Sequence, residues 1–202
     1  MAADDDIIIS PKSLSALFRL MTENDLWVLQ PAFSRFGKIT HSITQRRPHS
    51  RLRYTNFIEV TCPIFKTDKL LSFLSAYRPE LSLVYGVDWW YLHHLGNDER
   101  RRYAISDKYY YINPRDRFKP GGDREIDGLY NQAQRLSMWE DIKREIGIDS
   151  FPQQEFSVIE KGLSERIASY PRLGTMHQRD FLSLEMASSG RARSYLLLHR
   201  NV

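Results

Sequence analysis

The chain opens with Ala3-Asp4-Asp5-Asp6-Ile7-Ile8-Ile9, followed directly by Ser10-Pro11. Three adjacent carboxylates precede three isoleucines, and a β-branched apolar run predicts a short buried strand. The carboxylates would then lie at a strand end. Hard cations such as Mg2+ and Mn2+ take oxygen ligands of this kind and keep positions open for phosphates. The alternative is a solvated acidic segment that merely precedes the first helix.

Strand and helix patterns alternate after this stretch, which predicts an α/β layer. Ser10 is a good N-cap and Pro11 a good first helical residue, so we expect a helix that ends near Asn24-Asp25. Further elements are expected as a strand at Leu26–Leu29 stopped by Gln30-Pro31, a strand at Tyr54–Phe65, a helix capped by Thr67, a helix entered through Gly86, a strand at Tyr103–Ile112 interrupted at Asp107-Lys108, and a helix at Asp127–Ile146 closed by Gly147.

The last quarter of the chain has a different texture. We expect residues 1–150 to form one domain and residues 151–202 a helical extension. Within this extension, helices are predicted around Phe156–Ile167 and Phe181–Met186, with a joint at Ser188–Arg191. Within residues 1–150, Lys119–Gly122 carries a glycine pair that would suit a lid over a site or an ordinary surface loop.

Composition limits the class of protein. Hydrophobic residues make up 42% and charged residues 27% of 202 residues, which is ordinary for a soluble globular protein. Cys62 is the single cysteine, which excludes an internal disulfide and a thiolate zinc site. No export signal or membrane span is visible, so we expect a cytoplasmic protein.

The net charge of +4 suits anionic ligands. Two arginine clusters carry much of it, Arg46/Arg47/Arg51/Arg53 and Arg100–Arg102. Neither is interleaved with aromatic residues in a nucleic-acid-binding motif, so nucleic acid is a disfavoured partner and solvated faces the simpler explanation.

Five stretches in the same order resemble a known family. They are DDDI, DLWVLQPAF, HSITQRRPHSRLRYTNFIEVTCPIF, YGVDWW and the PGG loop. The family consists of largely uncharacterised bacterial and plant proteins classed as glycosyltransferase-like, and the resemblance covers roughly residues 4–147. It implies part of a GT-A fold: a mixed sheet flanked by helices that binds a nucleotide-sugar and a carbohydrate acceptor.

The resemblance also implies site residues. Asp4 and Asp6 would hold a Mn2+ or Mg2+ that bridges the donor diphosphate, with Asp5 in support. Glu59 and Asp88 match the family's site carboxylates, and Asp88 is the candidate catalytic base. Each has a structural alternative: Asp88 could cap a helix, and Glu59 could pair with Arg53.

Three further residues are candidate substrate contacts. Trp89 and Trp90 could stack on a sugar ring or fill a core. Arg53 and its neighbouring arginines could steer a diphosphate or form an exposed face. The adjacent His93 and His94 point in different directions on a helix, which favours ordinary surface histidines.

Two departures from the family pattern matter. Family members carry a nucleotide-binding half before the acidic triplet, and this chain starts where that half ends, so the chain would either be truncated and inactive alone or need a partner chain that supplies this half. Asn113 stands where a histidine is expected to complete the metal shell, and an amide oxygen is a weaker ligand. We therefore expect metal-dependent glycosyl transfer, with a non-catalytic carbohydrate- or protein-binding remnant as the alternative.

Overall fold

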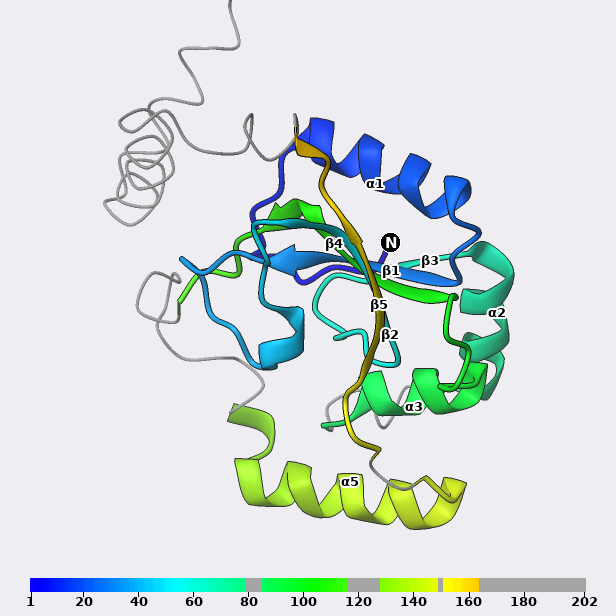
Figure 1. The fold of residues 1–202 in the computed structure, drawn as a ribbon. Coiled ribbons are helices and arrows are strands. Elements are labelled where there is room, and N and C mark those ends of the chain that lie inside the picture. The colour runs from blue at the N-terminus through cyan, green and yellow to red at the C-terminus, as the bar shows by residue number, and fades with distance from the viewer. Residues whose placement is uncertain (79–84, 116–127, 149–150, 164–202) are drawn as a thin grey trace, which may run out of the picture.

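A computed structural model describes residues 1–78, 85–115, 128–148 and 151–163. This part of the chain is a mixed α/β fold with five strands in one open sheet. Figure 1 shows α1 on one side of the sheet and α2, α3 and α5 on the other. The elements are α1 Pro11–Glu23, β1 Val28–Phe33, the 3-10 helix η1 Ser42–Thr44, β2 Ser50–Thr55, β3 Ile64–Phe65, α2 Thr67–Ala76, α3 Val87–Leu95, β4 Tyr103–Tyr111, α5 Gln132–Ile146 and β5 Glu155–Glu160.

The strand order is β3-β1-β4-β2-β5, and among the strand pairs in the described ranges only β1 and β4 run parallel. These two central strands therefore end at the same edge of the sheet, at Phe33 and Tyr111. Ligands of open α/β sheets commonly bind beyond the carboxyl ends of parallel strands. This edge of the sheet is consequently a candidate location for a ligand-binding site.

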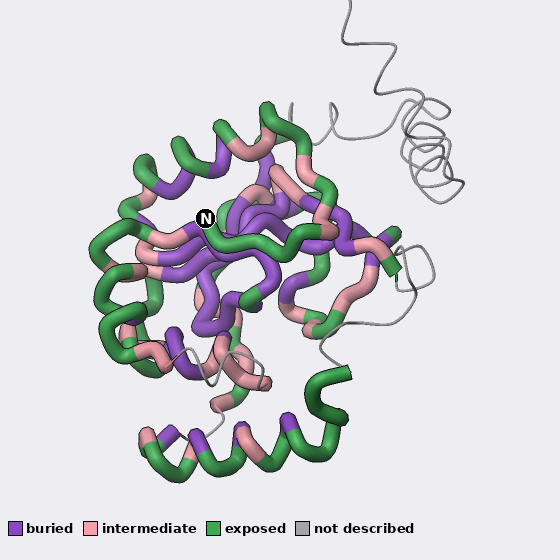
Figure 2. The backbone as a smooth tube through the Cα atoms, turned by 180° about the vertical axis from the view of Figure 1, so that it is seen from behind, coloured by how far each residue is buried: buried purple, intermediate pink, exposed green. Residues whose placement is uncertain are grey.

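Both faces of the central strands are buried, as Figure 2 shows. Alternate residues of a strand point to opposite faces. Leu29 packs under α1 with Leu17 and Leu20, whereas Val28 packs on the other side with Phe73 and Tyr91. The α/β class predicted from the sequence is thus confirmed, because helices cover both faces of the sheet.

The predicted boundaries of α1 and α5 hold at the ends that have local signals. Ser10 accepts a hydrogen bond from Ser13 N at the start of α1, and Gly147 ends α5 with φ 68°. The start of α5 is later than expected, because Asn131 and Gln134 form a capping box there. Leu129 is consequently 64% exposed and lies before the helix.

Several strand predictions were wrong. The isoleucine run contributes a single bridge, Ile8 to Ile112. The strand expected to stop before Pro31 continues to Phe33, because Pro31 sits at a register shift of the β1–β4 pairing, where its missing N–H is tolerated. Asp107-Lys108 does not interrupt β4, which runs without a break from Tyr103 to Tyr111. The irregularity on this strand is the same register shift in its pairing with β1.

The long strand predicted at Tyr54–Phe65 was also wrong. The β2 strand ends at Thr55, and the Asn56 amide donates to Gln154 O at 3.1 Å outside the sheet. Glu59 therefore lies in the irregular segment between β2 and β3, instead of inside a strand. This departure from the sheet turns Glu59 toward other chain segments.

Residues after 150 do not behave as a helical extension where they are described. Phe156 and Ile159, expected on a helix, lie in β5, which pairs with β2 in the sheet of the first 150 residues. The predictions at Lys119–Gly122, Phe181–Met186 and Ser188–Arg191 lie outside the described residues. None of the helices in the described ranges is long and apolar enough to span a bilayer.

Candidate functional site

Two of the predicted catalytic carboxylates lie in one place. Asp88 is the second residue of α3, and Glu59 lies in the segment between β2 and β3. Both are buried, at 7% and 5% exposure. The charge of Asp88 acts on Glu59, and so does that of Asp4. Glu59 is therefore close enough to both Asp4 and Asp88 for their charges to act on it.

The start of α3 is set by packing at Gly86. This residue has φ 85°, a left-handed conformation that favours glycine. A Cβ there would lie 2.2 Å from the Trp139 ring. Gly86, and not Asp88, is the N-cap, so the structural role considered for Asp88 is not the one it takes. The backbone amides of Asp88 and Trp89 instead act on its carboxylate and lower its pKa.

Burial changes the protonation of both carboxylates. It raises the pKa of Asp88 to about 6, against the lowering effect of the two amides. Burial also raises the pKa of Glu59 to about 7, with a hydrogen bond from Thr61 opposing it and the charge of Asp88 adding to it. Near neutral pH Asp88 is thus mainly ionised, while Glu59 holds a proton for much of the time.

Hydrogen bonds fix the Glu59 segment. The Glu59 amide donates to Gln30 Oε1 at 2.8 Å, and Thr61 Oγ1 donates to Glu59 Oε1 at 2.9 Å. At the preceding residue in the chain, the Tyr91 hydroxyl donates to Ile58 O. These contacts tie the segment to β1 and α3, so the position of Glu59 relative to Asp88 is defined by three parts of the fold.

His41 is a site residue that sequence reasoning missed. Its Nε2 lies 3.9 Å from Asp88 Oδ2, and its Nδ1 lies 2.9 Å from Gln153 Nε2. Burial lowers the pKa of this imidazole, so the ring is neutral at pH 7. The sequence signal was a lone histidine in the HSITQ stretch, which by itself does not point to any partner.

A series of ring contacts starts at His41, the residue beside Asp88. The Phe57 ring centroid lies 4.7 Å from that of His41 and 4.8 Å from that of Trp89, and Trp89 also meets Phe151 at 4.6 Å. Trp89 is half-buried, whereas Trp90 is 4% exposed and packs on Phe73 and Tyr77. Of the two tryptophans, Trp89 is the one with surface near Asp88.

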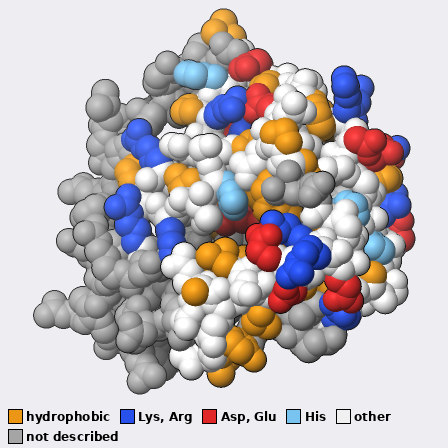
Figure 3. Space-filling model, turned by 90° about the horizontal axis from the view of Figure 1, so that it is seen from below, with side chains coloured by type: hydrophobic (Ala, Val, Ile, Leu, Met, Phe, Trp, Pro, Cys, Tyr) orange, Lys and Arg blue, Asp and Glu red, His pale blue; other side chains and the backbone are white. Residues whose placement is uncertain are grey.

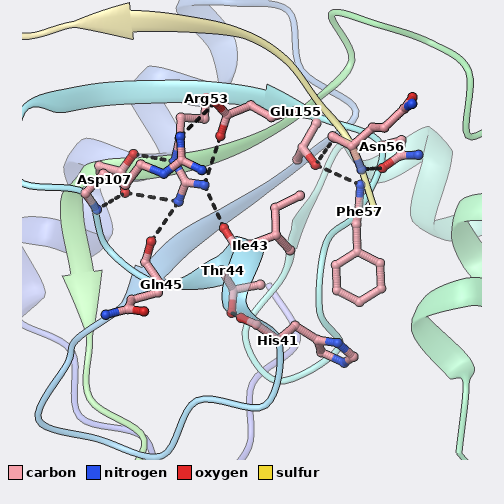
Figure 4. A network of polar contacts seen from close by, with 12 residues as sticks. His41, Ile43, Thr44, Gln45, Arg53, Asn56, Phe57, Asp107 and Glu155 are labelled. Carbon is pink, nitrogen blue, oxygen red and sulfur yellow. Dashed lines mark hydrogen bonds and ion pairs between the residues drawn. The ribbon is translucent and has the colours of Figure 1, made fainter. Parts of the chain in front are cut away.

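Arg53 does not have the position expected of a substrate contact. It is fully buried, its guanidinium bonds to Asp107 and Glu155, and its remaining donors reach the carbonyls of Ile43 and Gln45. Figure 4 shows this network with the His41 ring directed away from it. Arg53 therefore holds β2, β4 and β5 together and is not a partner of Glu59.

The acidic triplet lies along the Thr61 to Pro63 segment. The amide of Asp4 donates to Thr61 O at 3.1 Å, and that of Ala2 donates to Pro63 O at 3.0 Å. Asp4 and Asp5 are exposed, and Asp6 is half-buried. This places the triplet on the Glu59 side of the site.

The donor set predicted for a metal is incomplete. Within the ranges that the structure describes, no three His, Cys, Asp or Glu side chains come together to hold a metal ion. Asn113, the predicted third ligand, is buried with its Oδ1 outside any hydrogen bond. Because these residues do not form a ready cation site, the chemistry of the site is assigned to protein side chains alone, and Asp4, Asp6 and Asn113 stay predicted ligands.

Comparison of the chain with protein-family models, curated proteins and solved structures gave no match.

Proposed function

We propose that this chain is a glycosyltransferase-like protein that transfers a sugar from a nucleotide-sugar to an acceptor hydroxyl. The observation that supports it best is the meeting of Asp88, Glu59 and His41, from three separate segments, beside the partly exposed ring of Trp89. Carboxylates with raised pKa values in a partly apolar site are typical of acid–base chemistry.

Asp88 is the proposed general base. With a pKa of about 6 it is ionised at pH 7 and still basic enough to take a proton from a hydroxyl whose oxygen is forming a bond. In the transfer, the acceptor oxygen forms a bond to the anomeric carbon and its proton moves to Asp88. The bond between that carbon and the diphosphate breaks, and the diphosphate leaves with the electron pair.

Glu59 has a different proposed role. Its pKa of about 7 lets it keep a proton beside the ionised Asp88, and a neutral carboxyl can donate a hydrogen bond to a ligand oxygen. The neutral His41 adds a second polar group 3.9 Å from Asp88. The two side chains would orient the acceptor hydroxyl toward the base.

Trp89 is the proposed sugar platform. The faces of sugar rings pack on aromatic side chains, and Trp89 is the tryptophan at this site that is not fully buried. We expect Trp89→Ala to weaken binding of the acceptor and, because Trp89 packs on two core clusters, also to destabilise the fold to some extent. Trp90→Ala should instead destabilise the fold by about 3–5 kcal/mol, because it leaves a cavity in the core.

The test is sugar transfer by the full chain from UDP- and GDP-sugars to a panel of glycans, with and without Mn2+. Asp88→Asn should keep the fold and abolish transfer, whereas the exposed Asp141→Asn is the matched control and should transfer normally. Unchanged transfer by Asp88→Asn would remove the base from the mechanism. Joint stabilisation by Mn2+ and nucleotide would support the predicted metal ligands Asp4 and Asp6.

A carbohydrate-binding function without turnover is the second candidate. The partly exposed ring of Trp89, which packs on the buried Phe57, favours it, since this ring would hold a sugar whether or not Asp88 acts as a base. Binding of a glycan that needs Trp89 but is indifferent to Asp88→Asn, together with no transfer from any donor, would select this function over the first.

A further inference from the structure

A basic hollow lies at the edge where the two parallel strands end. It is lined by Arg35, Gly37, Lys38, Ile39 and Arg115, and we call it the Arg35–Arg115 hollow. Arg35 and Lys38 belong to the turn that follows β1, and Arg115 follows β4. The cations thus come from two segments about 80 residues apart in the sequence, and the parallel pairing of β1 and β4 brings them together.

The backbone holds these segments in fixed positions. The Lys38 amide donates to Asn113 O at 2.8 Å, and the Ser34 amide donates to Tyr111 O at 2.8 Å. At Gly37 a Cβ would lie 2.5 Å from Asn113 O, so the turn can approach this closely only with glycine. The hollow is therefore organised by the main chain before any ligand binds.

The described residues that line the hollow carry charge of one sign. Its described lining carries three cationic side chains and no carboxylate, and among the described residues neither Arg35 nor Arg115 forms an ion pair. Both arginines are exposed, and Arg35 lies over the Phe36 ring at 4.9 Å. A guanidinium group can donate two parallel hydrogen bonds to two oxygens of one phosphate. A hollow lined by arginines therefore suits a phosphate group.

A second hollow offers an internal comparison. It is lined by Arg100, Arg101 and Arg102, but also by Glu23, Asp25 and Glu99. There the charges compensate each other, and Arg102 pairs with Asp25. On the face seen from below in Figure 3, basic side chains gather on one side, whereas side chains of both signs are mixed on the other.

We propose that the Arg35–Arg115 hollow binds the phosphate groups of a substrate. This proposal rests on the proposed sugar transfer, since it names where the substrate's phosphates lie. His41 follows Lys38 by three residues, so their Cα atoms are at most about 11 Å apart. A ligand with its phosphates in the hollow can therefore reach His41 and Asp88 with its sugar. The phosphates can belong to a nucleotide-sugar donor or to a phosphorylated acceptor.

The first experiment measures binding of inorganic pyrophosphate to the full chain by calorimetry. We expect Arg35→Gln and Arg115→Gln each to weaken binding about tenfold, which is typical for loss of a charge-assisted hydrogen bond. Arg100→Gln and Arg101→Gln are the matched controls, because both are exposed arginines that lie over aromatic rings. Equal affinities of the four variants, or no binding by the unaltered chain, would overturn the proposal.

The second experiment separates the two sources and the two proposals. A nucleoside diphosphate that binds more tightly than pyrophosphate, with the same dependence on Arg115, assigns the phosphates to the donor. Tighter binding of a sugar phosphate assigns them to the acceptor. Asp88→Asn should bind pyrophosphate as the unaltered chain does. If pyrophosphate binding depends on the arginines but Asp88→Asn still transfers sugar, Asp88 is not the base and the proposal for the hollow stands. If Asp88→Asn abolishes transfer but the arginine variants bind pyrophosphate normally, only the proposal for the hollow is contradicted.

Discussion

His41 Nε2 lies 3.9 Å from Asp88 Oδ2, while its other ring nitrogen lies 2.9 Å from Gln153 Nε2. An amide nitrogen can only donate, so Nδ1 accepts and the proton of the neutral ring is on Nε2, facing Asp88. The histidine therefore connects the segment before β5 to the first turn of α3, and it covers a carboxylate whose protonation depends on burial.

The first prediction concerns the protonation of Asp88. Burial is the main cause of its raised pKa, and the His41 ring is part of what covers it. His41→Ala should admit water, so that the pKa of Asp88 falls from about 6 toward the ordinary aspartate value. A carboxyl-carbon NMR titration measures this, with the exposed Asp98 as an internal reference. An Asp88 midpoint that does not move would show that other groups exclude the water.

The second prediction is a pH dependence of stability at Glu59. Its pKa is raised from 4.5 to about 7 in the folded chain, so between these values the native state binds more protons than the unfolded state. The free energy of unfolding contributed by this group therefore falls as the pH rises through that window. Glu59→Gln removes the effect, and its stability relative to the unaltered chain should rise with pH by about 3 kcal/mol.

Urea denaturation at pH 5 and pH 8 tests the Glu59 prediction, since the m-value shows whether the transition itself has changed. The matched control is Glu23→Gln, at an exposed position at the end of α1, which should show the same stability difference at both pH values. A constant difference for Glu59→Gln as well would mean that Glu59 is ionised across the whole range.

The third prediction concerns the buried ion pair of Arg53 and Asp107. Arg53 Nε donates to Asp107 Oδ2 at 2.7 Å, and both side chains are fully buried. Asp107→Asn leaves a buried cation short of its counter-charge, which should destabilise the fold by about 3–5 kcal/mol. Glu145→Gln breaks the exposed pair with Arg78 and should cost less than about 1 kcal/mol. Chemical denaturation compares them, and equal losses would contradict the structural role given to Arg53.

The fourth prediction separates space from backbone conformation at two glycines. Gly86 and Gly147 both have positive φ. A Cβ added at Gly86 would lie 2.2 Å from the Trp139 ring, whereas a Cβ added at Gly147 would have no described heavy atom within 4 Å. Gly147→Ala should cost about 1 kcal/mol for the left-handed conformation alone. Gly86→Ala should cost clearly more and displace α3, which would lower the pKa of Asp88 by admitting water. Similar losses in thermal denaturation would argue against the packing explanation.

Local chemistry accounts for what the sequence predicted well. Ser10, Pro11 and Gly147 mark helix ends because caps and left-handed turns depend on neighbouring residues only. The α/β class followed from alternating periodicities. Asp88 and Glu59 were singled out through a family resemblance, and the fold then placed them together.

The tertiary structure decided everything that depends on residues distant in the chain. The β5 strand formed from a segment with helical spacing because β2 offered it an edge to pair with, and Pro31 stayed in a strand because the sheet shifts register there. Strand pairing also determines which residues are neighbours in space. It places His41 beside Asp88, Arg53 in a buried network, and Arg35 in the same hollow as Arg115. The free energy of strand pairing comes from contacts between segments far apart in the sequence, so a local sequence pattern cannot predict which strands pair.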